Sequence, residues 1–142
     1  MTGILNLRLT AAIQFHETLH GFRTSRGTGI ASLEAKLLKK LMNMREDVLY
    51  EILLDIHKAY GNLDPDLYLN TLVVYAVGPW SLRLLRHYWA RLMMVARDSA
   101  YFGTPFKGYH GVNQGDPLSP TIFNVVIDAV LQHWVTVVAL TE

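Results

Sequence analysis

A carboxylate ends an apolar run near the middle of the chain. Residues 48–55 read VLYEILLD, and this β-branched and aliphatic stretch predicts a buried strand that ends at Asp55. Burying a charge without a partner is unfavourable by several kcal/mol, so such an aspartate needs a reason. A carboxylate at a strand end suits Mg²⁺, which prefers hard oxygen ligands. On this feature alone, an aspartate that caps the next turn is an equal alternative.

A second polar segment leads into a helix. Residues 111–120 read GVNQGDPLSP, in which a glycine, an amide side chain and a rigid proline-containing turn precede a predicted helix start. The first turn of a helix presents unpaired N–H groups, which suit an anionic or polar ligand. An ordinary Asp-Pro helix entry is the alternative. The combined spacing argues against it, and the residues concerned are Gln114, Gly115, Asp116, Pro117, Ser119 and Pro120.

The elements upstream of the carboxylate are a loop and a helix. Residues 19–29 are rich in glycine, threonine, serine and arginine, which is typical of a loop. Residues 30–44 carry leucines at helical spacing with lysines on the other side, which predicts a helix. Thr28 or Ser32 is suited to cap it.

The elements downstream predict an α+β domain. A helix is expected over residues 66–76, and Pro79 begins a second helix that runs to about Arg97. One face of this second helix is basic, but a plain exposed face explains it better than nucleic-acid contact; the residues are Arg83, Arg86, His87 and Arg91. A hairpin of two short strands is expected within residues 99–112, around Thr104-Pro105. A tight turn and a final helix from about Leu118 complete the α+β pattern.

Composition narrows the class of protein. The 142 residues suffice for one domain with a sizeable core. With 13 basic and 12 acidic residues the formal net charge is +1, which excludes a strongly basic nucleic-acid coat. The absence of cysteine excludes disulfides, thiolate metal sites and cysteine nucleophiles. A hydrophobic content of 51% excludes a disordered chain.

The last helix carries a polar stripe. Residues 121–140 have the length of a membrane span, but Asn124, Asp128 and Gln132 recur every four residues on one face. An aspartate near the middle of an isolated span is unfavourable, so we expect a core helix that faces a polar site. Arg8 lies inside the first apolar stretch with no basic residue before it, which is atypical of a signal peptide and leaves the compartment undetermined.

Three segments together resemble the motifs of reverse transcriptases. LLDIHKAYGNLD at residues 53–64 and GVNQGDPLSPTIFN at residues 111–124 are similar to two successive palm motifs of the retrotransposon and group II intron branch. HGFRTSRGTGIA at residues 20–31 resembles the fingers motif that precedes them. The QGDPLSP string is highly specific. The resemblance implies an incomplete right-hand polymerase fold, with part of the fingers at residues 1–46 and the first half of the palm at residues 47–142.

The resemblance also implies a reaction and a metal site. The family transfers nucleotides from deoxynucleoside triphosphates to the 3′-hydroxyl of a DNA primer on an RNA template. Asp55 would bind both catalytic Mg²⁺ ions, which activate the hydroxyl and neutralise phosphate charge, and the backbone carbonyl of Ile56 would help hold one ion. Tyr60 would lie next to the sugar and favour deoxynucleotides. Ala59, beside it in the sequence, would also be a nucleotide-binding residue. Core packing is the alternative for Tyr60.

Further roles follow by position. Gln114 and Gly115 would shape the pocket for the incoming nucleotide and the template base. Arg23 and Arg26 would line the fingers near the triphosphate or the template backbone, and a solvated loop remains an open alternative for both. The structural residues of the motif would hold the helix against the palm; they are Asp116, Pro117, Ser119, Pro120 and Asn124.

The sequence departs from the family pattern at two points. Gly61 follows Tyr60 where this branch usually has a second aspartate. The family's next motif carries two adjacent aspartates, whereas no two aspartates are adjacent in this sequence. One carboxylate holds two Mg²⁺ ions poorly, so we predict that this chain by itself does not polymerise.

Two hypotheses from other classes remain. A non-catalytic remnant of a mobile element could hold RNA through the loop and the basic helix face, although the near-neutral charge argues against strong binding. A membrane-associated protein could use residues 121–140 as its anchor, against which the polar stripe argues. In the intact enzyme the partners would be an RNA template, a DNA primer and deoxynucleoside triphosphates, with no membrane. The source element and the oligomeric state are left open.

Overall fold

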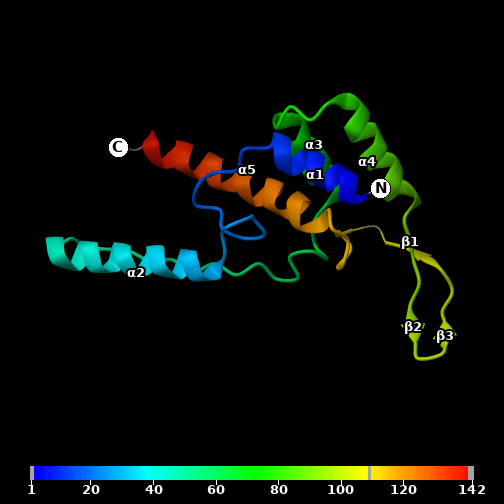
Figure 1. Cartoon of the computed structure of the whole chain (residues 1–142), viewed down its shortest axis with the longest axis horizontal. Helices are drawn as coiled ribbons and strands as arrows, with labels where there is room; N and C mark the ends of the chain where they lie inside the picture. The colour runs from blue at the N-terminus through cyan, green and yellow to red at the C-terminus, as the bar shows by residue number, and fades with distance from the viewer. Residues whose placement is uncertain (1, 109, 141–142) are drawn as a thin grey trace.

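The core forms around one long C-terminal helix. The computed structural model describes residues 2–108 and 110–140. In this part of the chain, α5 (Ser119–Ala139) runs across the molecule, and three helices gather beside its first half (Figure 1); these are α1 (Thr2–Ala12), α3 (Pro65–Val74) and α4 (Pro79–Arg91). Helix α2 (Thr28–Arg45) stands apart from them. Together with two short antiparallel strand pairs, these helices confirm the α+β class.

Apolar side chains from four helices fill the interior. Ile122 and Val125 of α5 are completely buried, and so are Leu72 of α3 and Leu85 of α4. The ring of Tyr68, also completely buried, packs against Trp89 with the ring centroids 4.7 Å apart. This interdigitation removes apolar surface from water, which is the main favourable term in folding.

Helix α1 was not predicted from the sequence. Its buried residues Leu5 and Leu9 are spaced four apart, and Ile13 continues the same row into the core. The hydroxyl of Thr121 donates a hydrogen bond to the side-chain oxygen of Asn6, which ties α1 to the start of α5. The short apolar row explains why the segment is helical in its tertiary context although its periodicity is weak.

Helix α2 matches the predicted helix, but its predicted caps are wrong. Gly27 is the N-cap residue, so both predicted caps, Thr28 and Ser32, lie inside the helix. No side chain accepts a capping hydrogen bond at this end. Helix α2 buries none of its residues, and its leucines are exposed; they are Leu33, Leu37, Leu38 and Leu41. The amphipathic pattern therefore predicted the helix correctly, while the apolar face has no cover among the described residues.

The predicted buried strand at residues 48–55 is wrong. The segment is irregular, and Tyr50, Leu53 and Leu54 are 88%, 88% and 78% exposed. A strand needs a neighbouring strand to pair its backbone amides and carbonyls. No strand in the described part lies against this segment, so its apolar residues have no sheet to join.

The helices before the hairpin follow the prediction more closely. Asp64 caps α3 by accepting a hydrogen bond from the amide of Asp66, and Pro65 occupies the first turn. Helix α4 ends at Arg91, earlier than predicted, because Leu92 turns to an extended conformation. Trp80, near its start, is 67% exposed and so lies outside the buried face of this helix.

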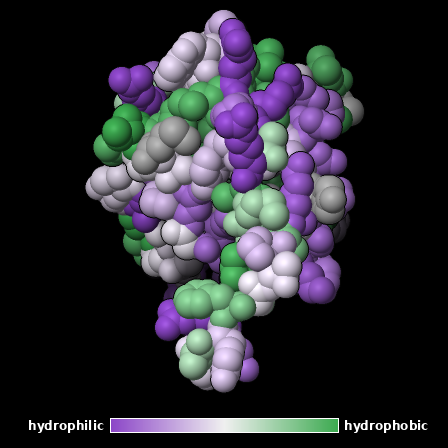
Figure 2. Space-filling model, turned by 90° about the vertical axis from the view of Figure 1, so that its right-hand side faces the viewer, coloured by the Kyte–Doolittle hydropathy of each residue, from purple (hydrophilic) through white to green (hydrophobic). Residues whose placement is uncertain are grey.

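A hairpin forms, but not with the predicted turn. Strand β1 (Met93–Met94) pairs with β4 (Phe106–Lys107), and β2 (Arg97–Asp98) pairs with β3 (Tyr101–Phe102). The chain reverses at Ser99, which has a φ of 43°, and not at Thr104-Pro105. A proline lacks the amide that a ladder requires, so residues 103–105 form an irregular interruption between β3 and β4. Figure 2 shows the hairpin projecting below a surface of mixed polar and apolar side chains.

Helix α5 has two different halves. Its first half is buried and includes the predicted stripe residues Asn124 and Asp128, whereas Gln132 is exposed. Its second half exposes apolar side chains, among them Trp134 and Val135. Within the described part, α5 is the one helix long and apolar enough to cross a bilayer. The burial of the polar residues Asn124 and Asp128 is the arrangement expected where a core helix faces polar groups.

Candidate functional site

Two backbone hydrogen bonds join the two palm-like motifs. The amide of Val112 donates to the carbonyl oxygen of Tyr60 over 2.8 Å, and the amide of Gly111 donates to the carbonyl oxygen of Leu63 over 2.8 Å. Gly111 has a φ of +85°, and a Cβ there would lie 2.7 Å from the Tyr60 carbonyl oxygen and 2.9 Å from the Gly61 Cα. Only glycine fits this close approach in this conformation.

Tyr60 lies between α5 and the loop that follows α1. Its ring centroid is 5.4 Å from that of Phe123 on α5 and 6.3 Å from that of Phe22 in the loop. The side chain is half-buried, and this burial raises the pKa of the Tyr60 phenol above its ordinary value of 10.0. The phenol is therefore neutral at physiological pH and presents a polar hydroxyl on an apolar ring.

Asp55 and Ile56 lie in the exposed irregular segment before Tyr60. Between them and Tyr60 the chain turns at Lys58, which has a φ of 46°, and the Asn62 side chain holds this turn by donating to the His57 carbonyl oxygen over 2.9 Å. Ala59 is partly buried beside Tyr60. No group of three or more metal-binding side chains occurs in the described part. The donor set here, a single exposed carboxylate, does not fit a two-metal centre.

The entry to α5 is held by Asp116. One carboxylate oxygen accepts a hydrogen bond from the amide of Leu118 over 3.0 Å, and the other accepts one from the hydroxyl of Tyr88 over 2.9 Å. Burial, this hydrogen bond and the charge of Asp116 raise the pKa of Tyr88 to about 12. The Ser119 hydroxyl donates to the Asn113 carbonyl oxygen over 2.6 Å. The predicted turn is present, and it does serve as an Asp-Pro helix entry.

Gln114 and Gly115 form the exposed tip of that turn. Gly115 has a φ of +91°, a conformation that favours glycine, and no atom lies within 4 Å of the Cβ position. Pro117 is exposed and Pro120 lies in the first turn of α5. The Gln114 side chain and the Gly115 backbone are therefore accessible from solvent beside the helix start.

The loop at residues 13–27, here called the arginine loop, uses both of its arginines internally. Arg23 donates to the carbonyl oxygens of His16 and Leu19 over 2.8 and 2.9 Å, and its guanidinium lies over the ring of Phe15. Arg26 pairs with the carboxylate of Glu17. These contacts order the loop and leave both arginines only partly exposed.

Asn124 joins the arginine loop to α5. Its side-chain amide is buried and donates to the Gly21 carbonyl oxygen over 2.7 Å. A cavity of about 270 Å³ lies between the loop and α5, and its wall includes Phe22, Arg23, Thr121 and Asn124. The predicted structural residue Asn124 and the predicted loop residue Arg23 thus face the same space.

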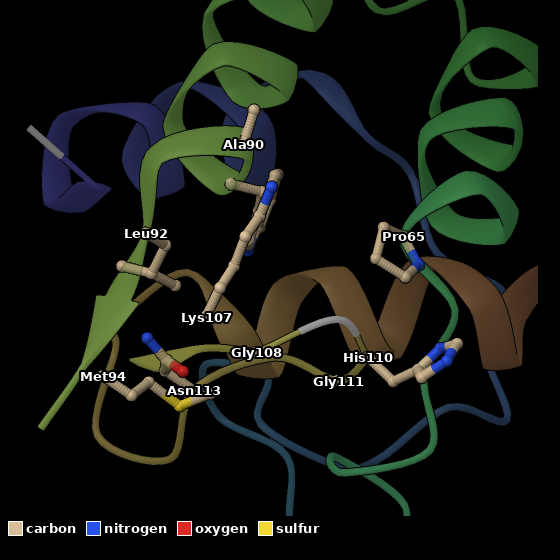
Figure 3. Close-up of a pocket in the computed structure, with 10 residues that line it drawn as sticks. Pro65, Ala90, Leu92, Met94, Lys107, Gly108, His110, Gly111 and Asn113 are labelled. Carbon is tan, nitrogen blue, oxygen red and sulfur yellow. The ribbon is translucent and has the colours of Figure 1, made fainter. Parts of the chain in front are cut away.

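A second cavity lies beside Gly111. It measures about 200 Å³ and opens between the end of α4, the base of the hairpin and the loop before α5 (Figure 3). Leu92, Met94 and Asn113 line one side and His110 and Pro65 the other. The sequence did not predict it, because its walls come from segments that are far apart in the chain.

Sequence reasoning also missed the partners of the polar side chains. Tyr88, which holds Asp116, was not predicted, and neither was the contact of His16 with Asp128. The polar stripe was a signal that Asp128 faces something polar. Every non-proline residue has a backbone amide, so the sequence could not predict that the amide of His16 is the donor to Asp128.

Comparison with known proteins identifies the family of this chain. Residues 1–140 match the family described as reverse transcriptase (RNA-dependent DNA polymerase). The chain is 25% identical over 132 residues to the retrovirus-related Pol polyprotein from type-2 retrotransposable element R2DM of Drosophila melanogaster. That match covers 93% of this chain and 12% of the relative, so the chain spans about an eighth of the relative's length. The reaction characteristic of the matched family is RNA-templated DNA synthesis. With the family match extending over nearly all its residues, the chain belongs to the reverse transcriptase family.

Proposed function

We propose that this chain forms part of the fingers and the first half of the palm of an RNA-directed DNA polymerase. The observation that carries the proposal is the docking of Gly111 and Val112 onto the Tyr60–Leu63 backbone. This docking sets Tyr60 beside Phe123, near the start of α5. In a polymerase, the ligand that such a tyrosine would contact is a nucleoside triphosphate.

The nucleotide-facing roles are divided between three segments. Tyr60 would lie against the sugar and disfavour a ribose 2′-hydroxyl by its bulk. Gln114 and Gly115 would contact the nucleotide or the template base from the turn. Arg23 and Arg26 would face the triphosphate or template backbone, and their internal contacts would hold the loop in place for that purpose.

Asp55 is proposed as one ligand for a divalent cation, with the Ile56 carbonyl beside it. Among the described residues no group of three or more metal-binding side chains forms, so a two-metal mechanism needs ligands from outside them. The 142-residue chain by itself is therefore proposed to be inactive in primer extension, and DNA synthesis on an RNA template and a DNA primer would belong to the intact enzyme.

Nuclear magnetic resonance of the labelled chain tests the nucleotide site. A deoxynucleoside triphosphate should shift the amide signals of Tyr60, Gln114 and Gly115 more strongly than the matching ribonucleotide. Tyr60→Ala should remove that difference, whereas Tyr101→Ala, on the exposed hairpin, should keep it. Equal responses to both sugars in the unmodified chain would overturn the role of Tyr60.

The metal role needs a separate measurement. Substoichiometric Mn²⁺ should broaden the amide signals of Asp55 and Ile56, and Asp55→Asn should abolish the broadening. Asp98→Asn, which removes an exposed carboxylate on the hairpin, is the matched control. Primer extension by the isolated chain on an RNA template, lost in Asp55→Ala, would contradict the proposed inactivity.

A further inference from the structure

Asp128 is a buried carboxylate for which the family motifs provide no role. Its side chain is completely buried in the middle of α5, and none of the ion pairs found in the described part involves it. A buried charge requires compensating hydrogen bonds. Its oxygens accept three of them, from donors on three different parts of the fold.

The donors show what Asp128 connects. One oxygen accepts from the backbone amide of His16 over 2.6 Å. The other accepts from the hydroxyl of Tyr75, at the end of α3, and from the side-chain amide of Gln132 over 2.7 Å. Only the His16 bond reaches into the arginine loop, while Tyr75 and Gln132 both donate to the other oxygen of the same carboxylate.

His16 in turn holds Arg23. The carbonyl oxygen of His16 accepts a hydrogen bond from the Arg23 guanidinium over 2.8 Å, and it also accepts one from the amide of Leu19 over 3.1 Å. The backbone of His16 therefore contacts both side chains, Asp128 through its amide and Arg23 through its carbonyl oxygen. A displacement of His16 would move the arginine as well.

A second contact one helical turn earlier makes the attachment rigid. Asn124 and Asp128 are four residues apart on the same face of α5, and Asn124 binds the Gly21 carbonyl oxygen. On its other side, the arginine loop is tied to α2 by the 2.9 Å contact between Nε2 of His20 and a carboxylate oxygen of Glu34. Asn124 and Arg23 both line the 270 Å³ cavity between the arginine loop and α5.

We propose that Asp128 is a positioning residue, which holds the arginine loop on α5 and so sets Arg23 over the cavity between them. The proposal concerns the loop's attachment; its relevance to nucleotide or template contact rests on the proposed function. Because the attachment is made through a backbone amide, the side chain at position 16 matters less than the carboxylate at position 128.

Hydrogen exchange of the 142-residue chain tests the attachment. Asp128→Ala should accelerate exchange of the His16 and Leu19 amides roughly ten- to hundredfold, as expected for loss of a hydrogen bond to a charged acceptor. Asp128→Asn, which retains one acceptor oxygen, should leave both amides close to their original rates. Tyr75→Phe is the matched control, because it removes a hydrogen bond from the same carboxylate but leaves the His16 contact.

Three results would overturn the proposal. Exchange at His16 and Leu19 could be unchanged in Asp128→Ala, or Tyr75→Phe could release the loop as strongly. In the unmodified chain, an unprotected His16 amide without the downfield shift of a charge-assisted hydrogen bond would also overturn it. If Asp128→Ala fails to fold, Asp128→Leu removes the acceptor at similar volume and takes its place.

Arg23→Gln separates this inference from the proposed function. If that variant binds a deoxynucleoside triphosphate and an RNA oligonucleotide as the unmodified chain does, the role proposed for Arg23 fails. The exchange rates of His16 and Leu19 still decide whether Asp128 holds the loop.

Discussion

The amide of Val112 donates a 2.8 Å hydrogen bond to the carbonyl oxygen of Tyr60, although 51 residues separate the two in the chain. The neighbouring Gly111–Leu63 bond makes this contact a short stretch of paired backbone. Helices α3 and α4 and the hairpin form the intervening chain. The two palm-like motifs thus meet through their backbones, and side-chain identity is constrained where the backbones come closest.

That close approach predicts effects of different size when two glycines are replaced by alanine. Gly111→Ala should lower the free energy of unfolding by about 1–3 kcal/mol, because its Cβ would press on the Tyr60 carbonyl in a left-handed conformation. Gly61→Ala should change it by less than about 0.5 kcal/mol, because its Cβ would make ordinary contacts, the nearest at 3.6 Å to the Lys58 carbonyl oxygen. Urea denaturation followed by circular dichroism measures both, and equal losses would contradict the geometry.

The helix entry at Asp116 should behave as a coupled pair with Tyr88. Asp116→Ala removes the acceptor of the Leu118 amide and should lower stability by about 1–2 kcal/mol. Tyr88→Phe should lower it less, since only one of the two hydrogen bonds is lost. In a double-mutant cycle the two effects should fall short of additivity. Strict additivity would show that the hydroxyl and the carboxylate do not interact in solution.

Alkaline pH should destabilise the protein through its buried tyrosines. Burial and then the contact with Asp128 raise the pKa of Tyr75 well above its ordinary value of 10.0. The folded state keeps this proton when the unfolded state has lost it, so stability is complete below pH 10 and declines as pH rises above it. Tyr75→Phe should make this decline shallower, and Tyr101→Phe on the exposed hairpin should leave it as steep. Urea midpoints measured between pH 8 and about pH 11 would show the difference.

The exposed apolar face of α2 should tolerate charge. Leu37 is 56% exposed, so Leu37→Glu should change the free energy of unfolding by less than about 0.5 kcal/mol. Leu72→Glu places a charge at a completely buried position and should prevent folding. Circular dichroism and sedimentation of the two variants check this. Loss of folding in Leu37→Glu would mean that α2 is covered in solution.

Local chemistry made several elements readable from the sequence. Asp64 and Pro65 are a start signal that needs no tertiary context, and α3 begins there. The leucine spacing in α2 and the apolar length of α5 identified both helices. The short α1 has only weak periodicity, so it was missed; the helix is stabilised by the contact of Leu5 and Leu9 with the core.

The residues at 48–55 show where local pattern is insufficient. Their composition is that of a buried strand, but a strand exists only with a neighbour that pairs its backbone, and none of the described strands does so. Asp55 is therefore identified by its motif and not by a structured metal site. The hairpin turn lies at a different position from the predicted one for a similar reason, because the register of pairing depends on both strands and not on one strand alone.

The sequence alone determined the family and the positions of its motifs, because QGDPLSP and the segment around Asp55 are contiguous strings whose residue types carry the signal. It also placed Asn124 and Asp128 on one face of a helix, since helical periodicity is a local property. Only the tertiary structure decided what that face binds. The acceptor of Asn124 is the Gly21 carbonyl and a donor to Asp128 is the His16 amide. Every residue has such backbone groups, so only folding selects which of them meet.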